Sequence, residues 1–209
     1  MIRKTLIAAL LAALSASAVA AVSPDEAAQL GKTLTPVGAE KAGNKDGTIP
    51  EWTGGLTTIP AGFKPGDGIR PDPFAGDKPR LVINGQNADQ HKDKLTAITY
   101  ALLKRYPTMR VDVYPTRRPV TYPKKVLENT AKNATQAKAV DGGLGFENAL
   151  PGIPFPIPKT GNEVMWNHLM RYNGISSTCK YDAFNIDASG TATLSATGLS
   201  SQEWPLYRP

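Results

Sequence analysis

The residues of this chain best suited to acid–base or metal chemistry are two histidines and one cysteine, and their spacing fits neither task. His91 and His168 are far apart, without an HExxH motif or a pair of cysteines, so the minimum local signature of a zinc site is missing. No serine occupies the GxSxG motif that an ordinary esterase needs for its nucleophile. We therefore expect no catalytic residue, no metal and no cofactor, in a protein that is not an enzyme.

Three further motifs are incomplete. Residues 142–145 (GGLG) lack the lysine and the serine or threonine of a phosphate-binding loop, so they predict a tight turn. Residues 44–51 hold only some of the alternating oxygen ligands of a calcium loop, which leaves calcium as the minority interpretation. Asn133 begins an Asn-Ala-Thr glycosylation triplet, a short pattern that arises by chance. None of these motifs adds a site.

Residues 141–172 form the most informative stretch of the chain. After the glycine turn, Ile153, Phe155 and Ile157 alternate with prolines. Proline holds such a backbone extended, so the three apolar side chains line one edge at little cost in entropy. This proline strip, residues 150–158, either closes the core of the protein or faces an apolar ligand.

A helix should follow the proline strip. Residues 160–163 have the spacing of a capping box, and the next residues place Met165, Trp166, Leu169 and Met170 in one apolar sector. Methionine and indole suit an adaptable wall that contacts lipid, although core packing is the more frequent role of such a stripe. The candidate ligand-binding residues are Ile153, Phe155, Ile157, Trp166 and Met170.

Short helices and strands must position these residues. The strongest helical pattern covers 88–106, with Leu95, Ile98, Leu102 and Tyr106 at helical spacing. Apolar and charged residues alternate over 109–113, which predicts a half-buried strand that ends at Pro115. Other patterns predict a short helix after the Ser23 capping box that ends at Gly31, a polar helix over 124–138, and a hairpin of 181–187 with 191–196.

Residues 36–79 are too rich in proline and glycine for a helix or a central strand to run through them. We expect a long irregular segment here. Large apolar residues are rare in disordered chains, so their recurrence indicates a segment that lies on the folded body, held by its aromatic side chains. These residues are Trp52, Leu56, Ile59, Phe63, Ile69 and Phe74.

The start of the chain has the pattern of a secretory signal peptide. Basic residues at 3 and 4 precede an apolar run over 6–14 and small residues up to Ala20. The run is far shorter than the roughly 20 apolar residues of a membrane-spanning helix, and no later segment approaches that length. A lipoprotein would carry a cysteine just after the run. We therefore expect residues 1–20 to be removed and residues 21–209 to form a single domain in the periplasm.

The charge and the cysteine content limit the kinds of partner that we expect. The formal net charge of +6 includes Arg3 and Lys4, and the other basic residues are scattered. A face that binds nucleic acid shows clustered basic residues, so we expect no nucleic-acid partner, whereas a loose attraction to anionic head groups stays open. Cys179, the only cysteine, should be a buried or half-buried small residue, with a dimer-forming thiol as the minority interpretation.

Several long motifs resemble domain-of-unknown-function family 1329, and together they cover nearly the whole chain after the predicted signal peptide. They are residues 23–56 (SPDEAAQLGKTLTPVGAEKAGNKDGTIPEWTGGL), 106–118 (YPTMRVDVYPTRR), 129–138 (NTAKNATQAK), 152–174 (GIPFPIPKTGNEVMWNHLMRYNG), 181–190 (YDAFNIDASG) and 202–207 (QEWPLY).

This resemblance implies a fold and a setting. The implied fold is α+β, with a partial curved antiparallel sheet around packed helices, as in outer-membrane lipoprotein carriers, preceded by the long irregular segment. Members of the family resemble periplasmic proteins and are often encoded near an outer-membrane-associated partner family and large exporters. They are typically longer than this chain, so the resemblance also implies a truncated member whose hairpin has an uncovered edge.

Two functions are therefore expected. The favoured one is a periplasmic protein that binds or shuttles a lipid or another hydrophobic molecule in the cell envelope. The alternative is an envelope interaction protein that docks onto an outer-membrane or exporter partner and carries no ligand.

Overall fold

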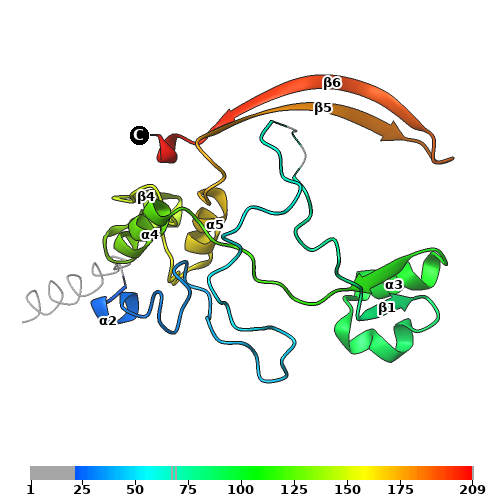
Figure 1. Cartoon of the computed structure of the whole chain (residues 1–209), viewed down its shortest axis with the longest axis horizontal. Helices are drawn as coiled ribbons and strands as arrows, with labels where there is room; N and C mark the ends of the chain where they lie inside the picture. Colours follow the sequence, from blue (N-terminus) through cyan, green and yellow to red (C-terminus); the bar gives the residue numbers. More distant parts are fainter. Residues whose placement is uncertain (1–21, 67, 69, 209) are drawn as a thin grey trace, which may run out of the picture. The chain divides into compact units, whose positions relative to one another are not determined.

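The computed structural model describes residues 22–66, 68 and 70–208 (Figure 1). The predicted signal peptide, residues 1–20, lies outside these residues, as does Ile69. The chain divides into two compact units: unit 1 consists of Met1–Lys41 and Tyr122–Pro209, and unit 2 of Ala42–Thr121. The described residues combine helices with three two-stranded antiparallel sheets, so the fold is of the mixed α+β type that the sequence predicts.

Local side chains set the starts of two helices of unit 1. In α2 (Pro24–Ala27), Ser23 accepts a hydrogen bond from the backbone N–H of Glu26, and the Glu26 carboxylate accepts one from Ser23 N–H. In α5 (Gly161–Leu169), Thr160 and Glu163 form the same reciprocal pair. Both predicted capping boxes are confirmed, because the motif needs only neighbouring residues.

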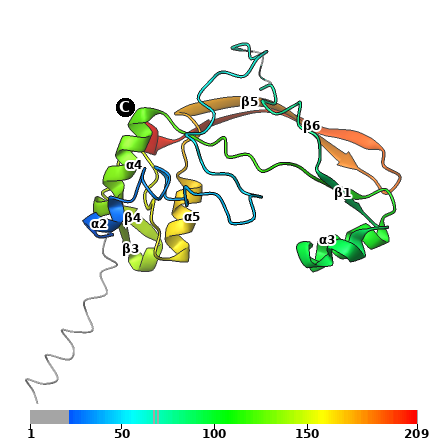
Figure 2. The ribbon, with the colours of Figure 1, turned by 60° about the horizontal axis from the view of Figure 1, so that its bottom comes forward.

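Unit 1 also contains the polar helix α4 (Lys124–Gln136), close to its predicted bounds, and a small hairpin. The hairpin pairs β3 (Lys138–Val140) with β4 (Gly145–Glu147) and is joined by the 3₁₀ turn η2 (Asp141–Gly143). Gly142 and Gly143 have φ of +66° and +92°, a conformation that glycine adopts without strain. The predicted tight turn is confirmed, and Figure 2 shows this hairpin beside α4 and α5.

The end of unit 1 is a long two-stranded ribbon (Figures 1 and 2). It pairs β5 (Ser176–Ile186) with β6 (Ala192–Glu203), has a bulge after Ala183, and is followed by the 3₁₀ turn η3 (Pro205–Tyr207). The predicted hairpin is confirmed and is longer than the sequence pattern indicates. Cys179 is exposed on β5, so the expectation that it is buried is wrong: among the described residues, no third strand covers this ribbon.

Unit 2 holds a small core between a strand pair and two helical segments. β1 (Leu81–Asn84) pairs with β2 (Arg110–Val113), which confirms the predicted strand. The connection contains the 3₁₀ helix η1 (Ala88–Lys94) and α3 (Ala97–Arg105). Ile83, Ala88 and Leu103 are buried together at the centre.

The single helix predicted over residues 88–106 is wrong. Leu95 is extended (φ −112°, ψ 144°), and the Thr96 side chain caps a new helix by accepting a hydrogen bond from Thr99 N–H. As a result α3 buries Leu103, whereas Ile98 and Leu102, expected on its inner face, are 74% and 36% exposed. Leu95, which precedes α3, packs against the core as expected. A local cap thus overrides the longer apolar period.

Residues 41–80 contain neither helix nor strand among those described. Trp52, Leu56 and Phe74 are half-buried, as expected of side chains that hold the segment in place. Ile59 and Phe63 are instead 76% and 40% exposed, so the expectation that all of the large apolar residues hold the segment is wrong for these two. Among the described helices, none combines the length and the apolar character that crossing a membrane requires.

Candidate apolar binding site

The structure places the five candidate residues in unit 1 at different depths. Ile153 and Phe155 are buried, with 6% and 8% of their surface exposed. Ile157, Trp166 and Met170 are half-buried. The proline strip therefore closes the core at its first two apolar positions, which is one of the two alternatives that its sequence allows. The role of all five residues in binding a ligand stays a prediction.

An aromatic cluster explains the depth of Phe155 and Trp166. Phe146 of β4 meets both rings edge to face, with ring centroids 6.2 Å from Phe155 and 5.0 Å from Trp166. The Trp166 indole N–H donates to the carbonyl of Gly143 at 3.0 Å, so its polar atom is paired within the protein. Phe146 is not among the predicted site residues, and its signal in the sequence is its position directly after the glycine turn. These contacts make Trp166 part of a packed wall.

Polar side chains of α4 hold the backbone of the strip. Asn133 donates to the carbonyls of Leu150 and Ile153 at 2.9 and 3.1 Å and accepts from Leu150 N–H at 2.8 Å. Thr130 accepts from Ile153 N–H at 3.0 Å, and Asn129 donates to a carbonyl of the strip. Because proline has no N–H, an extended proline-rich segment cannot complete a strand ladder and needs side chains as partners. Asn133 is therefore a buried structural residue.

The helix α5 adds two more hydrogen bonds to the backbone of the strip. Asn167 accepts from Phe155 N–H at 2.9 Å and donates to the Phe155 carbonyl at 2.6 Å. Three apolar side chains of α5 nevertheless remain more than half exposed, namely Val164, Met165 and Leu169. The predicted apolar sector is thus split between a packed part and an exposed part.

A second apolar site lies in the irregular segment of unit 2, and we call it the unit 2 groove. It encloses about 450 Å³ and opens to solvent. Thr57, Thr58 and Arg70 supply its polar lining. Its apolar lining consists of Leu56, Ile59, Pro60, Phe63, Pro71 and Pro73. A volume of this size matches the roughly 300–1,000 Å³ of small-molecule pockets.

Residues 117–120 fix one wall of the groove. Leu56 N–H donates to the Pro119 carbonyl at 2.8 Å, and the Trp52 indole N–H donates to the Val120 carbonyl at 3.1 Å. Gly55 permits this close approach: its φ is +78°, and a Cβ there would lie 2.7 Å from the Val120 oxygen. Trp52 and Leu56 thus hold the segment against residues 117–120.

An ion pair fixes the neighbouring turn. Arg117 donates to Asp77 through Nε at 3.0 Å and Nη2 at 2.6 Å, and its guanidinium lies 5.3 Å from the centre of the Phe74 ring. Hydrogen bonds from Arg117 hold the pKa of Asp77 below its usual value. Backbone hydrogen bonds, an ion pair and a cation–π contact therefore stabilise the groove, although its described residues form no helix or strand.

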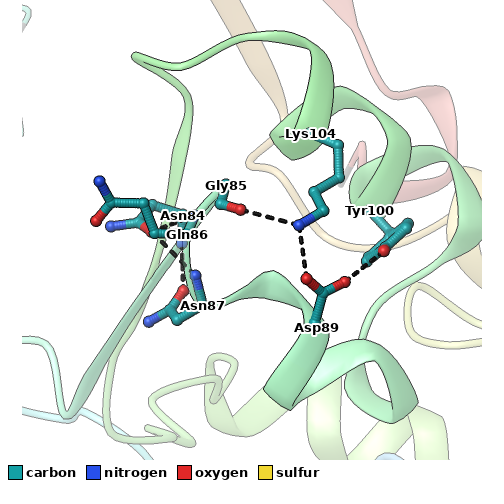
Figure 3. Close-up of polar contacts among 7 residues, drawn as sticks. All are labelled: Asn84, Gly85, Gln86, Asn87, Asp89, Tyr100 and Lys104. Atoms are coloured by element: carbon teal, nitrogen blue, oxygen red, sulfur yellow. Dashed lines mark hydrogen bonds and ion pairs between the residues drawn. The ribbon is translucent and has the colours of Figure 1, made fainter.

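The best-connected ionisable cluster lies between η1 and α3 (Figure 3). Asp89 accepts from the Tyr100 hydroxyl at 2.5 Å and from Lys104 Nζ at 2.7 Å, and Lys104 also donates to the Gly85 carbonyl at 3.2 Å. These bonds lower the pKa of Asp89 and raise the pKa of both Tyr100 and Lys104.

The direction of these pKa shifts indicates a structural role. A general base or a nucleophile needs a lysine or tyrosine that loses its proton more easily, and here both groups hold it more tightly. Figure 3 shows that hydrogen bonds also close the adjacent loop, since Asn84 Oδ1 accepts from Gln86 N–H at 2.9 Å and Asn87 Oδ1 accepts from Asn84 N–H at 2.8 Å. The cluster joins η1, α3 and the end of β1.

The two histidines belong to different units. His168 lies 3.1 Å from Arg171 on the exposed surface of unit 1, and His91 belongs to unit 2. Within the described ranges, no three histidine, cysteine, aspartate or glutamate side chains are grouped so that they could hold a metal ion.

Comparison with known proteins identifies the family. The model of a family described as a protein of unknown function, DUF1329, matches residues 82–209. Uncharacterized protein PA3922 of Pseudomonas aeruginosa is 52% identical over 165 residues, which cover 78% of this chain and 36% of that protein. The match thus spans about a third of the length of this curated relative. No solved structure matches the chain. The region matched by the family model includes the proline strip, α5 and the β5–β6 ribbon, and the chain therefore belongs to the DUF1329 family, as its motifs predict.

Proposed function

We propose that the protein binds or shuttles a lipid or another hydrophobic molecule in the cell envelope and catalyses no reaction. The observation that carries this proposal is the unit 2 groove, which is apolar, open to solvent and about 450 Å³ in volume. Ile59 and Phe63 line it and remain 76% and 40% exposed. Clustered apolar side chains that stay in water are typical of surfaces that bind something.

The proposal of binding without catalysis is supported by the direction of the pKa shifts in the Asp89 cluster. This cluster favours the protonated forms of Tyr100 and Lys104, because hydrogen bonds to Asp89 raise the pKa of both groups. The proposal assigns the protein to the periplasm because of the predicted signal peptide. It also takes the β5–β6 ribbon as part of the curved, carrier-like sheet that the family resemblance implies.

A binding titration with the fluorescent hydrophobic probe 1-N-phenylnaphthylamine tests the proposal. Replacing two apolar lining residues, in the double variant Ile59→Ser/Phe63→Ser, should weaken probe binding by about tenfold or more, because each buried apolar side chain contributes about 1.5–3 kcal/mol. Ile98→Ser is the matched control, since Ile98 is 74% exposed on α3 and does not line the groove. Equal probe affinity in the wild type and the double variant would contradict a role of this groove.

The β5–β6 ribbon favours a second candidate function, docking onto a protein partner of the envelope. Its strands are hydrogen-bonded only to each other among the described residues, and Phe184, Ile186 and Leu194 are exposed. Open strand edges of this kind accept an additional strand from a partner. Crosslinking in cells from a photoreactive residue at Leu194 would capture such a partner, and a ribbon that crosslinks to nothing would count against docking.

A further inference from the structure

Arg70 distinguishes the unit 2 groove from a purely apolar surface. Among the described residues that line the groove, it is the one that carries a charge. It forms no ion pair with any residue that the structure describes, whereas Arg117 of the same unit is held by Asp77 at 2.6 Å. The carboxylate of Asp72, two residues away, accepts a hydrogen bond from Phe74 N–H at 2.8 Å. An exposed cation therefore borders an apolar groove.

The groups that line the groove indicate the chemistry of its ligand. The guanidinium presents a planar fork of N–H donors that matches a carboxylate or phosphate oxygen pair. The hydroxyls of Thr57 and Thr58 add neutral hydrogen-bonding groups to the same lining. The apolar side chains of Leu56, Ile59 and Phe63 suit an alkyl chain. A cationic head group would be repelled by Arg70, and an uncharged one could form only the weaker hydrogen bond of a neutral acceptor.

We propose that the unit 2 groove binds a free, single-chain amphiphile with an anionic head, a long-chain carboxylate, and that Arg70 pairs with the head group. This inference rests on the proposed function, because it specifies the hydrophobic molecule that the groove takes. A free amphiphile is favoured over a membrane surface. The groove has a volume of about 450 Å³ and, among the described residues that line it, one cation, whereas attraction to anionic membranes requires clustered basic residues.

The test compares three ligands with the same chain length. Displacement of 1-N-phenylnaphthylamine is measured with dodecanoate, 1-dodecanol and dodecyltrimethylammonium, below the micellar range of each. The wild type should bind dodecanoate about tenfold or more tightly than the alcohol, as expected for a charge-assisted hydrogen bond, and the cationic amphiphile most weakly.

Three variants identify the group responsible. Arg70→Gln should remove the preference for dodecanoate over dodecanol, and Arg70→Lys should keep part of it, because lysine retains the charge and loses the fork. Lys64→Gln is the matched control: Lys64 is an exposed cation of the same segment that does not line the groove, and its loss should leave the preference unchanged. Circular dichroism checks that each variant is folded.

The outcomes separate this inference from the proposed function. If the wild type binds dodecanoate and dodecanol equally, or if Arg70→Gln retains the preference, the role of Arg70 is refuted while hydrophobic binding stands. If none of the ligands nor the probe binds, both proposals fail. Binding to phosphatidylglycerol vesicles without binding to dodecanoate would overturn the free amphiphile in favour of a membrane surface.

Discussion

At the scale of single residues, Asn133 is a buried side chain that holds the backbone of the proline strip. Its amide makes three hydrogen bonds to the backbone of the strip, and the side chain is 1% exposed. Asn133→Ala removes these bonds and leaves buried polar groups unpaired, so the free energy of unfolding should fall by about 2–4 kcal/mol. Urea denaturation measures the change.

Thr135, the third residue of the Asn-Ala-Thr triplet that begins at Asn133, provides a control for this prediction. Thr135 is exposed, and its hydroxyl contacts only the carbonyl of Lys132, one turn back on α4. Thr135→Ala should change stability by less than about 0.5 kcal/mol. Equal losses for the two variants would mean that the buried amide network does not hold the strip.

Tyr207 predicts how stability depends on pH at alkaline values. Its hydroxyl donates to the carbonyls of Met170 and Gly152 at 2.6 and 3.3 Å, and burial raises its pKa well above the usual value of 10.0. The unfolded state therefore loses this proton first, so the contribution is complete below about pH 10 and is lost as the pH rises further.

The variant Tyr207→Phe tests this dependence. It should be less stable than the wild type at neutral pH by about 1–2 kcal/mol, through the lost hydrogen bonds. Above about pH 10 its stability should fall less steeply than that of the wild type, because it has no phenol to ionise at this position. Parallel stability curves for the two proteins would show that Tyr207 does not titrate with folding.

At the scale of elements, Gly55 tests whether residues 117–120 shape the unit 2 groove. Gly55→Ala places a methyl group 2.7 Å from the Val120 oxygen at a φ of +78°. Gly47→Ala has a similar φ of +71° and open space around the new methyl group. Gly55→Ala should therefore cost about 1–3 kcal/mol more than Gly47→Ala in the free energy of unfolding and should weaken probe binding. Equal costs would show that this wall adapts freely.

The elements also show what a sequence can predict. The capping boxes at Ser23 and Thr160 depend on residues three apart, and both were predicted correctly. The break at Leu95 was missed because the cap at Thr96 competes with an apolar period that continues through it. The role of Asn133 was missed because its partners are 17 and 20 residues away, and Arg70 was missed because its neighbours come together only in the folded segment.

At the scale of the whole molecule, the family was predicted from long motifs and is confirmed, and the mixed α+β class agrees with the described helices and strands. The five candidate residues came from a pattern that fits a core as well as a ligand wall, and Ile153 and Phe155 are buried. The groove residues Ile59 and Phe63 were expected to hold the segment in place. Apolar periodicity predicts which side chains avoid water, but it does not distinguish contact with the protein from contact with a ligand.

The most direct test of the central claim, that the protein binds a hydrophobic molecule in the unit 2 groove, is mass spectrometry of the molecules that copurify with it. The wild type and Ile98→Ser, expressed and purified from cells in the same way, should each carry a hydrophobic anionic molecule after solvent extraction. Ile59→Ser/Phe63→Ser should carry about tenfold less of it. The account would be contradicted if the wild type and the double variant carried equal amounts of such a molecule, or if neither carried any.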